Sequence, residues 1–554
     1  MLERRILKIF ILIFLVFVFL IARMYYLQIY KGSRLSLAAS AQRIDRLDLD
    51  WSRGDIVDRN LIPFTNRKPM YRAVLKPLLL RGRDAEMGKI AGILGLDFKK
   101  VQGEMAVKGS PVLVDIDREQ RDKLQKSGIN SVSVVNSLKR NDETTLAKHI
   151  IGYLNQKDFR GEAALEKAYD DTLGNELKCS VGVVYDAKNN PVKGLGYRFI
   201  SYDGTGRTFK LKLTLDYHIQ KIVEEVMEKN RVTGAVVVED AGNGDIVAIA
   251  SKPDYKPDNL EEYLDSPGNE LFNRAVAAYN LGSIFKIIDV AVLYESNTEF
   301  SGEFFCNGSI NVGGREMRCT SFKEGGHGHL NLKRAFASSC NPYFINMGIK
   351  LGYEEILKMA GEFGLGKSTG VRKQGIDESS GNLPASDRYY SKGDIANIAI
   401  GQGEILATPL QVADLVATVA NGGIKNSINI VDSIVDDRGN IVRNISSRDS
   451  IRIISKSTAD KIKEFMEEVT VNGTGRGVEE TLDPYGGAAG KTGSAETGRY
   501  TGSQQEIHAW FGGYFPRNSP KYSIAVFVEN GKLGGKAAAP IFTQIAEKIM
   551  KKGL

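Results

Sequence analysis

An uninterrupted apolar run near the N-terminus sets the first limit on how this chain can fold. Residues 9–22 contain no charged side chain, and apolar residues on both sides extend the run. A helix through this segment is long enough to cross a bilayer, which needs about 20 residues. Arg4, Arg5 and Lys8 precede the run, so the positive-inside rule predicts a cytoplasmic N-terminus.

A cleaved signal peptide is the alternative for this segment. The run stays rich in phenylalanine to its end and is followed by Arg23, Met24 and Tyr25, without a small-residue cleavage pattern. The sequence therefore predicts a retained single-pass anchor in the cell membrane, formed by residues 1–29. Because no second run of this length follows, the rest of the chain is expected to lie outside the cytoplasm.

The length of 554 residues predicts at least two further domains. Residues 30–210 are charged and contain no cluster of catalytic residue types, which favours a non-catalytic pedestal with a small helical lobe around residues 84–105. Residues 211–554 form the second expected domain. The net charge of +7 is spread along the chain, so nucleic acid is not an expected partner.

Strand patterns stand at both ends of the second domain. Residues 235–238 and 246–250 flank an Asn-Gly turn at 243–244, and the runs 509–515 and 522–528 precede a helix that Pro540 is expected to open. Helical patterns lie between these two pairs of strands. The sequence predicts an α+β domain, in the broad α/β class, with one central antiparallel sheet flanked by helices.

A serine and a lysine three residues apart begin an apolar internal segment. Ser283 and Lys286 precede residues 287–293, which predict a buried helix with the serine in its first turn. Residues three apart share a helix face, so the lysine can reach the hydroxyl, and burial lowers a lysine pKa toward that of a base. The pair alone is a weak signal, because a capping serine beside a solvated lysine has the same pattern.

Two more polar groups follow in the chain. Ser339 and Asn341 stand at a predicted corner between helices, where Asn341 caps the second helix and Pro342 is its first residue. Residues 491–494, Lys-Thr-Gly-Ser, precede the strand pair, and their ammonium and hydroxyl groups suit a substrate carboxylate. The glycine is expected to let substrate approach the backbone. The Gly-Thr-Gly-Arg-Gly segment at 473–477 is interpreted as a flexible turn.

The three groups in this order resemble class B penicillin-binding proteins, monofunctional transpeptidases that cross-link peptidoglycan. The resemblance covers nearly the whole chain. It includes further segments, namely RGDIVDRN at 53–60, LTLD at 213–216, NRA at 273–275, GQG at 401–403, TPLQ at 408–411 and HAWF at 508–511. One departure is Leu281, where the family usually has proline, and another is Ser494, where threonine is common.

The resemblance implies a fold and an activity. The fold is the transpeptidase fold shared with serine β-lactamases, above an elongated pedestal. The activity is that of a peptidoglycan D,D-transpeptidase: Ser283 is acylated by the D-Ala-D-Ala end of a stem peptide or by a β-lactam, and Lys286 is the general base. The resemblance also implies a polytopic membrane glycan polymerase as partner.

Further roles follow from the same resemblance. Ser339 relays a proton to the leaving D-Ala, and Asn341 holds the substrate amide. Lys491, Thr492 and Ser494, with Gly493 between them, bind the terminal carboxylate. The backbone amides of Ser283 and Ser494 form the oxyanion hole.

Three of the four cysteines, Cys306, Cys319 and Cys340, lie between Ser283 and Asn341, together with His327 and His329. Three thiolates and one imidazole suit tetrahedral zinc. The spacing contains no C-x-x-C pair, so a Cys306–Cys319 disulfide with Cys340 unpaired is the alternative outside the cell. The segment resembles the zinc-binding segment of elongation-type class B enzymes, which favours structural zinc with His327 as the fourth ligand.

Other functions share parts of this pattern. A β-lactamase or a D,D-carboxypeptidase has the same catalytic groups, but neither needs the anchor and the pedestal. From a different class, the chain can be chiefly a scaffold that activates a glycan polymerase. No organic cofactor is expected.

Overall fold

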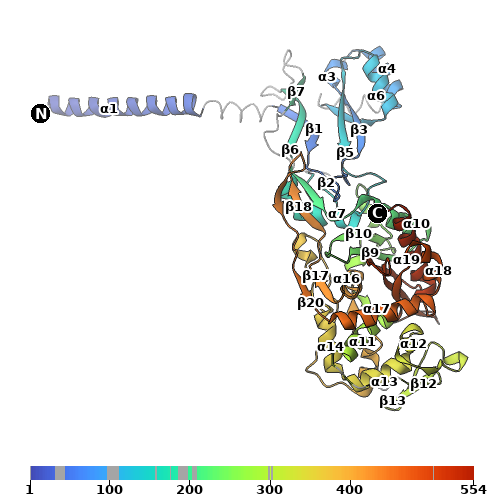
Figure 1. Cartoon of the computed structure of the whole chain (residues 1–554). Helices are drawn as coiled ribbons and strands as arrows, with labels where there is room; N and C mark the ends of the chain where they lie inside the picture. Colours follow the sequence, from blue (N-terminus) through green and yellow to red (C-terminus); the bar gives the residue numbers. More distant parts are fainter. Residues whose placement is uncertain are drawn as a thin grey trace. The chain divides into compact units, whose positions relative to one another are not determined.

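The computed structural model describes residues 2–31, 44–80, 82–96, 111–155, 159–174, 176–184, 197–201, 209–296, 298, 300, 303–502 and 504–554 (Figure 1). The chain divides into two compact units built from separate segments. The first unit contains Met1–Ser52, Lys68–Lys139 and Glu176–Arg207, and the second contains Arg53–Arg67, Arg140–Asn175 and Thr208–Leu554.

This division is more interleaved than the predicted boundary at residue 210. Segments 53–67 and 140–175 belong to the second unit because their apolar side chains join its core. Ile56, Phe64, Ile150 and Leu165 are buried there in one cluster with Leu211. The 2.7 Å salt bridge of Arg53 to the buried Glu166 and the hydrogen bond that Arg140 donates to the carbonyl of Gly54 over 2.8 Å fasten the two segments to each other.

The first unit contains the apolar helix and two small sheets. Helix α1 (Leu2–Tyr25) continues into the π-helical turn η1 (Tyr26–Tyr30), and the segment Ile6–Ile29 is long and apolar enough to cross a membrane. The antiparallel sheets have the strand orders β1-β6-β7 and β4-β3-β5. Their elements are β1 (Ile44–Ser52), β3 (Lys68–Leu75), α3 (Pro77–Leu80), α4 (Asp84–Leu94), β4 (Val112–Ile116), α6 (Arg118–Lys126), β5 (Val132–Lys139), β6 (Glu176–Val184) and β7 (Tyr197–Ser201).

A small helical lobe covers the β4-β3-β5 sheet. Met87, Ile90 and Leu94 on α4 pack with Leu124 of α6 against the strands. The predicted helix at 84–105 is therefore present as Asp84–Leu94, while residues 97–105 lie outside the described residues.

The second unit contains most of the described helices and the largest sheet. Its helices are α7 (Lys148–Ile151), α8 (Ala164–Ala168), α9 (Asp170–Leu173), α10 (Tyr217–Lys229), α11 (Lys286–Glu295), α12 (Leu332–Ala337), α13 (Asn341–Leu351), α14 (Tyr353–Glu362), α15 (Lys392–Ile398), α16 (Pro409–Ala420), α17 (Lys456–Val471), α18 (Gly477–Leu482) and α19 (Gly534–Lys551). Short 3₁₀ turns are η2 (Leu260–Tyr263), η3 (Arg274–Val276), η4 (Gly282–Phe285), η5 (Phe322–Glu324), η6 (Val371–Gln374) and η7 (Asp483–Tyr485).

The strands of this unit come from distant parts of the sequence. They are β2 (Ile56–Val57), β8 (Lys210–Leu213), β9 (Gly234–Asp240), β10 (Ile246–Lys252), β11 (Tyr279–Asn280), β12 (Phe304–Cys306), β13 (Ser309–Val312), β14 (Arg315–Arg318), β15 (Gly328–Leu330), β16 (Leu406–Ala407), β17 (Ile424–Asn426), β18 (Val431–Val435), β19 (Ile441–Asn444), β20 (Ser450–Arg452), β21 (Ala489–Thr501), β22 (Gln504–Phe515) and β23 (Tyr522–Val528).

One five-stranded antiparallel sheet organises the second unit, with the order β10-β9-β23-β22-β21. The N-terminal strand β9 pairs with the C-terminal strand β23, for example Val236 with Val526, and β10 pairs with β9. The predicted sheet, assembled from both ends of the domain, is confirmed. The strand β21 lies at the edge, so one of its sides is not covered by another strand of this sheet.

Both faces of this sheet are covered by helices (Figure 1). Because side chains alternate along a strand, Val236 and Val238 enter a cluster with α10 and α19, whereas Ala235 and Val237 enter the cluster that contains α11 and α16. The α11 helix is therefore buried between the sheet and other helices. The prediction that Pro540 opens the last helix is wrong, because α19 begins at Gly534 and contains the proline.

Candidate active site

Ser283 lies in a 3₁₀ turn that leads directly into the buried helix α11. The turn η4 comprises Gly282–Phe285, and α11 begins at Lys286. The prediction that the serine lies in the first α-helical turn is therefore corrected. The α-helix begins three residues after the serine, and its first residue is Lys286. The tighter turn still keeps both residues on adjoining turns of one continuous helical segment.

Close backbone contacts fix this turn. Gly282 has φ of 59°, and its N–H donates to the carbonyl of Gly401 over 2.8 Å. A Cβ on Gly282 would lie 2.6 Å from the carbonyl oxygen of Ser494, so only glycine fits here. The Trp510 indole donates to the carbonyl of Asn280 over 3.0 Å. The GQG and HAWF segments thus hold the serine turn against the sheet.

Leu281 takes the place where proline was expected. Its backbone has φ of −87° and ψ of −34°, in the helical region, and its side chain is fully buried. Packing of an apolar side chain therefore restrains this residue where a pyrrolidine ring would otherwise do so.

Ser339 occupies the corner between α12 and α13. Its φ of 57° is left-handed, a conformation that is uncommon for a non-glycine residue and typical of functional corners. The N-cap of α13 is Cys340, and Asn341 and Pro342 are its first helical residues, so the predicted cap at Asn341 is corrected by one position. The corner is predicted correctly in kind, and its side chains point back to the serine turn.

Lys286 joins the serine turn to this corner. Its Nζ donates to the carbonyl of Ser339 over 2.8 Å, to Ser339 Oγ over 3.3 Å and to Asn341 Oδ1 over 2.8 Å. The side chain is fully buried, and this loss of hydration lowers the pKa of Lys286 to about 8. A lysine with that pKa has a substantial neutral fraction and can accept a proton near neutral pH.

Lys491 approaches the same hydroxyl from the strand β21. Its Nζ donates to Ser339 Oγ and to the carbonyl of Thr492, each over 2.9 Å. Burial, reinforced by the neighbouring Lys286, holds the pKa of Lys491 well below its usual range. Two buried amino groups that share one acceptor favour the binding of an anion beside them.

Alternation along β21 separates its side chains into two sets. Thr492 and Ser494 line the cleft, and the Ser494 hydroxyl accepts from the N–H of Gly534 over 3.3 Å. Gly493 faces the other way, where an added Cβ would lie 3.0 Å from Ile284 and from Trp510. The small size of Gly493 therefore also allows the strand to pack closely on the serine turn.

Thr474 is a site residue that sequence reasoning missed. Its Oγ1 lies 2.5 Å from Oγ1 of Thr492, and its N–H donates to the carbonyl of Ala337 at the end of α12. Gly473 and Gly475 are both packed tightly against neighbours. The segment interpreted as a flexible turn is thus an ordered part of the cleft wall. Its one signal in the sequence was a hydroxyl between two glycines.

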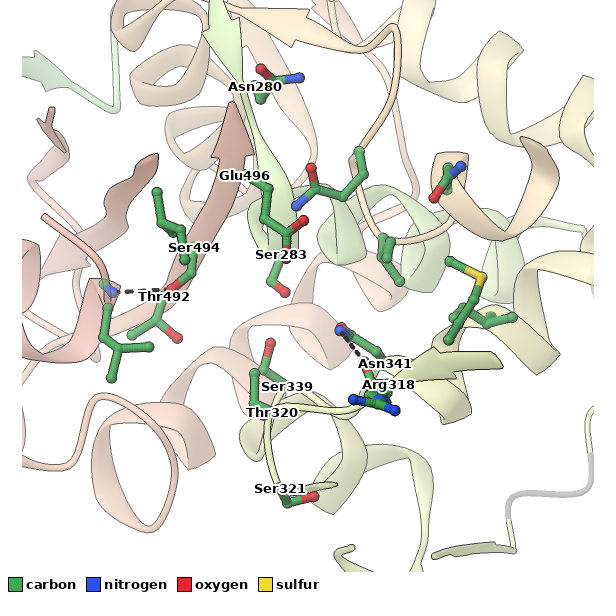
Figure 2. Close-up of a pocket in the computed structure, with 18 of the residues that line it drawn as sticks. Asn280, Ser283, Arg318, Thr320, Ser321, Ser339, Asn341, Thr492, Ser494 and Glu496 are labelled. Atoms are coloured by element: carbon green, nitrogen blue, oxygen red, sulfur yellow. Dashed lines mark hydrogen bonds between the residues drawn. The ribbon is translucent and has the colours of Figure 1, made fainter. Parts of the chain in front are cut away.

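These elements enclose a cleft of about 1300 Å³ (Figure 2). In Figure 2 the Ser283 hydroxyl points to the side of the cleft where Ser339 and Asn341 lie, while Thr492 and Ser494 stand on the neighbouring wall. The structure therefore brings all three predicted polar groups together around one serine, although they are separated by up to about two hundred residues of sequence.

The three cysteines and His327 also come together, directly behind the corner. The ligand atoms of Cys306, Cys319, His327 and Cys340 all lie within 4.8 Å of one another. His327 Nδ1 is 3.8 Å from Cys306 Sγ and 3.4 Å from Cys319 Sγ. The edges of a tetrahedral zinc site with thiolate and imidazole ligands are roughly 3.5 to 3.8 Å long. The donor set and its dimensions therefore fit zinc.

Neighbouring residues favour this set over the alternatives. All three cysteines are free thiols, so the Cys306–Cys319 disulfide is not formed. His329 is exposed and packs on the ring of Phe305, away from the thiols. Hydrogen bonds from Cys340 and His327 lower the pKa of Cys319, which favours a thiolate. A Cβ on Gly326 would lie 2.2 Å from the carbonyl oxygen of Cys306, so this glycine permits the approach of His327.

The fold and the cleft together define a class of protein: a serine-dependent acyl-transfer enzyme, in which a buried lysine adjoins the serine and a sheet edge forms one wall. The family model described as "Penicillin binding protein transpeptidase domain" matches residues 234–547. The chain belongs to this family, and the predicted enzyme class, a penicillin-binding serine transpeptidase, is confirmed.

Relatives extend this similarity beyond the catalytic unit. Stage V sporulation protein D of Bacillus subtilis is 29% identical, over 97% of this chain and 84% of that protein. Peptidoglycan D,D-transpeptidase MrdA of Acinetobacter baumannii is 28% identical, over 94% of this chain and 84% of that protein. Similarity therefore extends over nearly the whole chain.

Solved structures share the fold. Penicillin-binding protein PBP2 of Helicobacter pylori superposes with a TM-score of 0.67 and 23% identity, covering 91% of this chain and all of that one. A chain from a structure described as a peptidoglycan synthase complex that coordinates polymerization and crosslinking gives a TM-score of 0.70 and 23% identity. That match covers 99% of this chain and 98% of that one.

Proposed function

We propose that this chain is a class B peptidoglycan D,D-transpeptidase with Ser283 as its nucleophile. The observation that carries the proposal is the chain of contacts beside Ser283, in which Lys286 and Lys491 both donate to Ser339 Oγ. A base adjoining the serine and a relay hydroxyl leading to an anion-binding wall are the parts that acyl transfer from a carboxylate-ended peptide needs. The names of the MrdA relatives support the same activity.

Acylation uses these groups in a defined order. The terminal carboxylate of a D-Ala-D-Ala stem binds to the hydroxyls of Thr492 and Ser494, near the Lys491 ammonium. Neutral Lys286 accepts the Ser283 proton while Oγ attacks the penultimate D-Ala carbonyl, and the backbone amides of Ser283 and Ser494 hold the oxyanion. Ser339 passes its proton to the leaving nitrogen and takes up the proton held by Lys286, the C–N bond breaks, and D-Ala departs as an amine.

Cross-linking completes the cycle. The acyl-enzyme ester is attacked by an amine of a second stem, the C–O bond to Ser283 breaks, and the serine regains its proton through Lys286. Asn341 is placed to accept from the substrate amide as well as from Lys286. Attack by water instead would make the chain a carboxypeptidase or, with β-lactams, a β-lactamase.

Intact-mass measurement after incubation with benzylpenicillin tests this proposal. One adduct is expected on the intact chain and none on Ser283→Ala, whose melting temperature serves as the folding control. An adduct that persists on Ser283→Ala would refute the nucleophile. The lifetime of the adduct separates the activities, since loss within seconds indicates a β-lactamase and persistence for many minutes indicates a transpeptidase.

Structural zinc is part of the proposal. Cys306, Cys319, His327 and Cys340 would hold the ion, which neutralises the thiolates and clamps the corner between α12 and α13. Because Cys340 lies between Ser339 and Asn341, the ion would fix the relay and amide-binding side chains in place. No step of the acyl transfer runs through it.

The anchor and partner complete the proposal. Basic residues before the apolar helix support a cytoplasmic N-terminus, with the catalytic unit outside the membrane, where peptidoglycan is made. The similarity to a chain of a synthase complex supports a polytopic glycan polymerase as partner. Ser283→Ala separates a scaffold from an enzyme. If the chain is only a scaffold, the variant keeps both polymerase stimulation and cross-linking at their original levels. If the chain is a transpeptidase, the variant loses cross-linking.

A further inference from the structure

Glu496 lies on the cleft wall, on the same face of its strand as the residues proposed to bind the substrate. Side chains alternate along β21, so Thr492, Ser494 and Glu496 share one face, and all three line the cleft. In Figure 2 the Glu496 side chain extends from the strand toward the Ser283 end of the cleft. This carboxylate is not used in the acyl transfer described above.

The carboxylate is oriented but not neutralised. Gln505 on the paired strand β22 donates to Glu496 Oε2 over 2.9 Å, which holds the side chain in place. Within the described ranges, no lysine, arginine or histidine forms an ion pair with Glu496, and its Oε1 accepts no protein hydrogen bond. A positioned, exposed anion in a substrate cleft is a recognition element for a cation.

The direction of the bound peptide identifies which part of it meets this anion. In the proposed reaction the terminal carboxylate lies at Thr492 and the scissile carbonyl at Ser494. Peptide and strand both advance by about 3.3 Å per residue, so the portion upstream of D-Ala-D-Ala extends toward Glu496. Thr492 and Glu496 therefore lie at the two ends of the donor-binding edge.

The chemistry of cross-linking supplies a cation at that upstream position. The acceptor must carry a primary amine, and donor and acceptor stems come from the same polymer. An unused donor stem therefore carries the same amine, protonated at neutral pH, upstream of D-Ala-D-Ala. On this basis, and resting on the proposed transpeptidase function, we propose that Glu496 is a specificity-determining residue that binds the free ammonium of the donor stem.

Three penicillins that share a phenylacetamido side chain and differ in the substituent on its α-carbon test this assignment, because the penicillin side chain takes the place of the upstream stem. Benzylpenicillin is neutral there, ampicillin carries an ammonium and carbenicillin a carboxylate. For the intact chain, the second-order acylation rate relative to benzylpenicillin is expected to be about three- to fivefold higher for ampicillin and lower by a similar factor for carbenicillin.

In Glu496→Gln the acylation rates of ampicillin and carbenicillin relative to benzylpenicillin should both approach one. The benzylpenicillin acylation rate itself should stay within about twofold of that of the intact chain. In Glu496→Lys the order should reverse. High salt should reduce the spread in the intact chain, because the pair is exposed. Glu316→Gln is the matched control: Glu316 also lines the cleft but is bonded to Arg318 and Ser309, and its loss should leave the spread intact.

A second measurement uses peptides ending in Lys-D-Ala-D-Ala, with the lysine side chain either free or acetylated, and follows D-Ala release. The intact chain is expected to favour the free amine in kcat/KM, chiefly through KM, and Glu496→Gln to lose that preference. An unchanged preference in Glu496→Gln with both probe sets would overturn the inference. Failure of benzylpenicillin to acylate the intact chain would instead refute the proposed function.

Discussion

Lys491 Nζ and Ser339 Oγ, 152 residues apart in sequence, are joined by a hydrogen bond of 2.9 Å in a fully buried setting. The same oxygen accepts from Lys286 over 3.3 Å. One hydroxyl therefore connects the base beside the nucleophile with the anion-binding edge of the sheet. Its position, in the left-handed corner between α12 and α13, is set by backbone geometry and by the packing of two helices.

Replacing this hydroxyl should disable acyl transfer without unfolding the chain. In Ser339→Ala both buried lysines lose an acceptor and the leaving nitrogen loses its proton donor, so benzylpenicillin acylation is expected to fall by about 10²- to 10⁴-fold. Stopped-flow or intact-mass kinetics measure the rate. Ser338→Ala is the adjacent control, since the Ser338 hydroxyl donates only to the carbonyl of Arg334; equal rates in the two variants would remove Ser339 from the mechanism.

Acylation should depend on pH through Lys286. Burial lowers the pKa of this lysine to about 8, and only its neutral form accepts the Ser283 proton. The acylation rate with neutral penicillin is therefore expected to rise about tenfold per pH unit below pH 8 and to level off above it. The titratable groups that face Lys286 are Lys491, Asp289 and the Cys319 and Cys340 thiols. A rate that falls as pH rises through 8 would contradict this assignment of the base.

Gly282 and Gly477 should respond in opposite ways to the same substitution. Gly282→Ala forces a Cβ to within 2.6 Å of the Ser494 carbonyl oxygen at a positive φ, so a loss of at least about 1–3 kcal/mol and of most acylation is expected. Gly477 begins α18, and a Cβ there meets no atom within 4 Å, so Gly477→Ala should gain about 0.5–1 kcal/mol. Thermal melting and penicillin acylation of both variants check the pair.

Asp289 is a buried carboxyl one helical turn beyond Lys286. It is fully buried, and neither carboxyl oxygen has a hydrogen-bond partner among the described residues. Burial raises the pKa of Asp289 well above its usual value. At any pH where an aspartate in the unfolded chain is ionised, this group therefore lowers the free energy of unfolding. Asp289→Asn should therefore add at least about 1 kcal/mol of stability at neutral pH.

The pH dependence of this gain follows from its sign. Below about pH 4 the carboxyl is protonated in both states, and the advantage of Asp289→Asn should vanish. Between pH 4 and neutrality it should grow as pH rises. Thermal melting of the intact chain and the variant across this range measures it, and a gain that is constant with pH would show that ionisation is not its cause.

Metal analysis tests the cysteine cluster. One zinc ion per chain is expected in purified protein, and chelation should lower the melting temperature and slow penicillin acylation, because the ion fixes the corner that carries Ser339 and Asn341. Cys319→Ser should lose the metal. Cys179→Ser is the control, since Cys179 lies in the β6 strand of the other compact unit. Unchanged melting after complete metal removal would rule out a structural ion.

The central sheet and the convergence of the polar groups could be predicted because each left a local pattern. Strands β9 and β10 flank an Asn-Gly turn, and the run predicted at 522–528 coincides with β23. The order of Ser283, Ser339 and Lys491 along the chain was the pattern that predicted the active site. The start of the last helix was predicted wrongly. The helix α19 continues through Pro540, because the missing N–H of the proline removes only one helical hydrogen bond near the start of the helix.

Thr474 and Glu496 could not be found in this way. Thr474 reaches Thr492 only because a tight turn after α17 is packed between α12 and the sheet. The place of Glu496 on the cleft wall depends on the alternation of side chains along β21, whose pairing with β22 is regular from Ala489 to Glu496 and shifts only after Glu496. Both are properties of tertiary packing, which local patterns do not encode.

The interleaving of the two compact units limits how genes of this family can exchange parts. Ile56, Phe64, Ile150 and Leu165 are encoded ahead of codon 211 yet complete the core of the catalytic unit. A recombination junction near codon 210 would combine these core residues from one parent with the rest of the core from another, and such chimaeras should be recovered mainly between close relatives. If the junction lies before codon 53, all residues of that core come from a single parent.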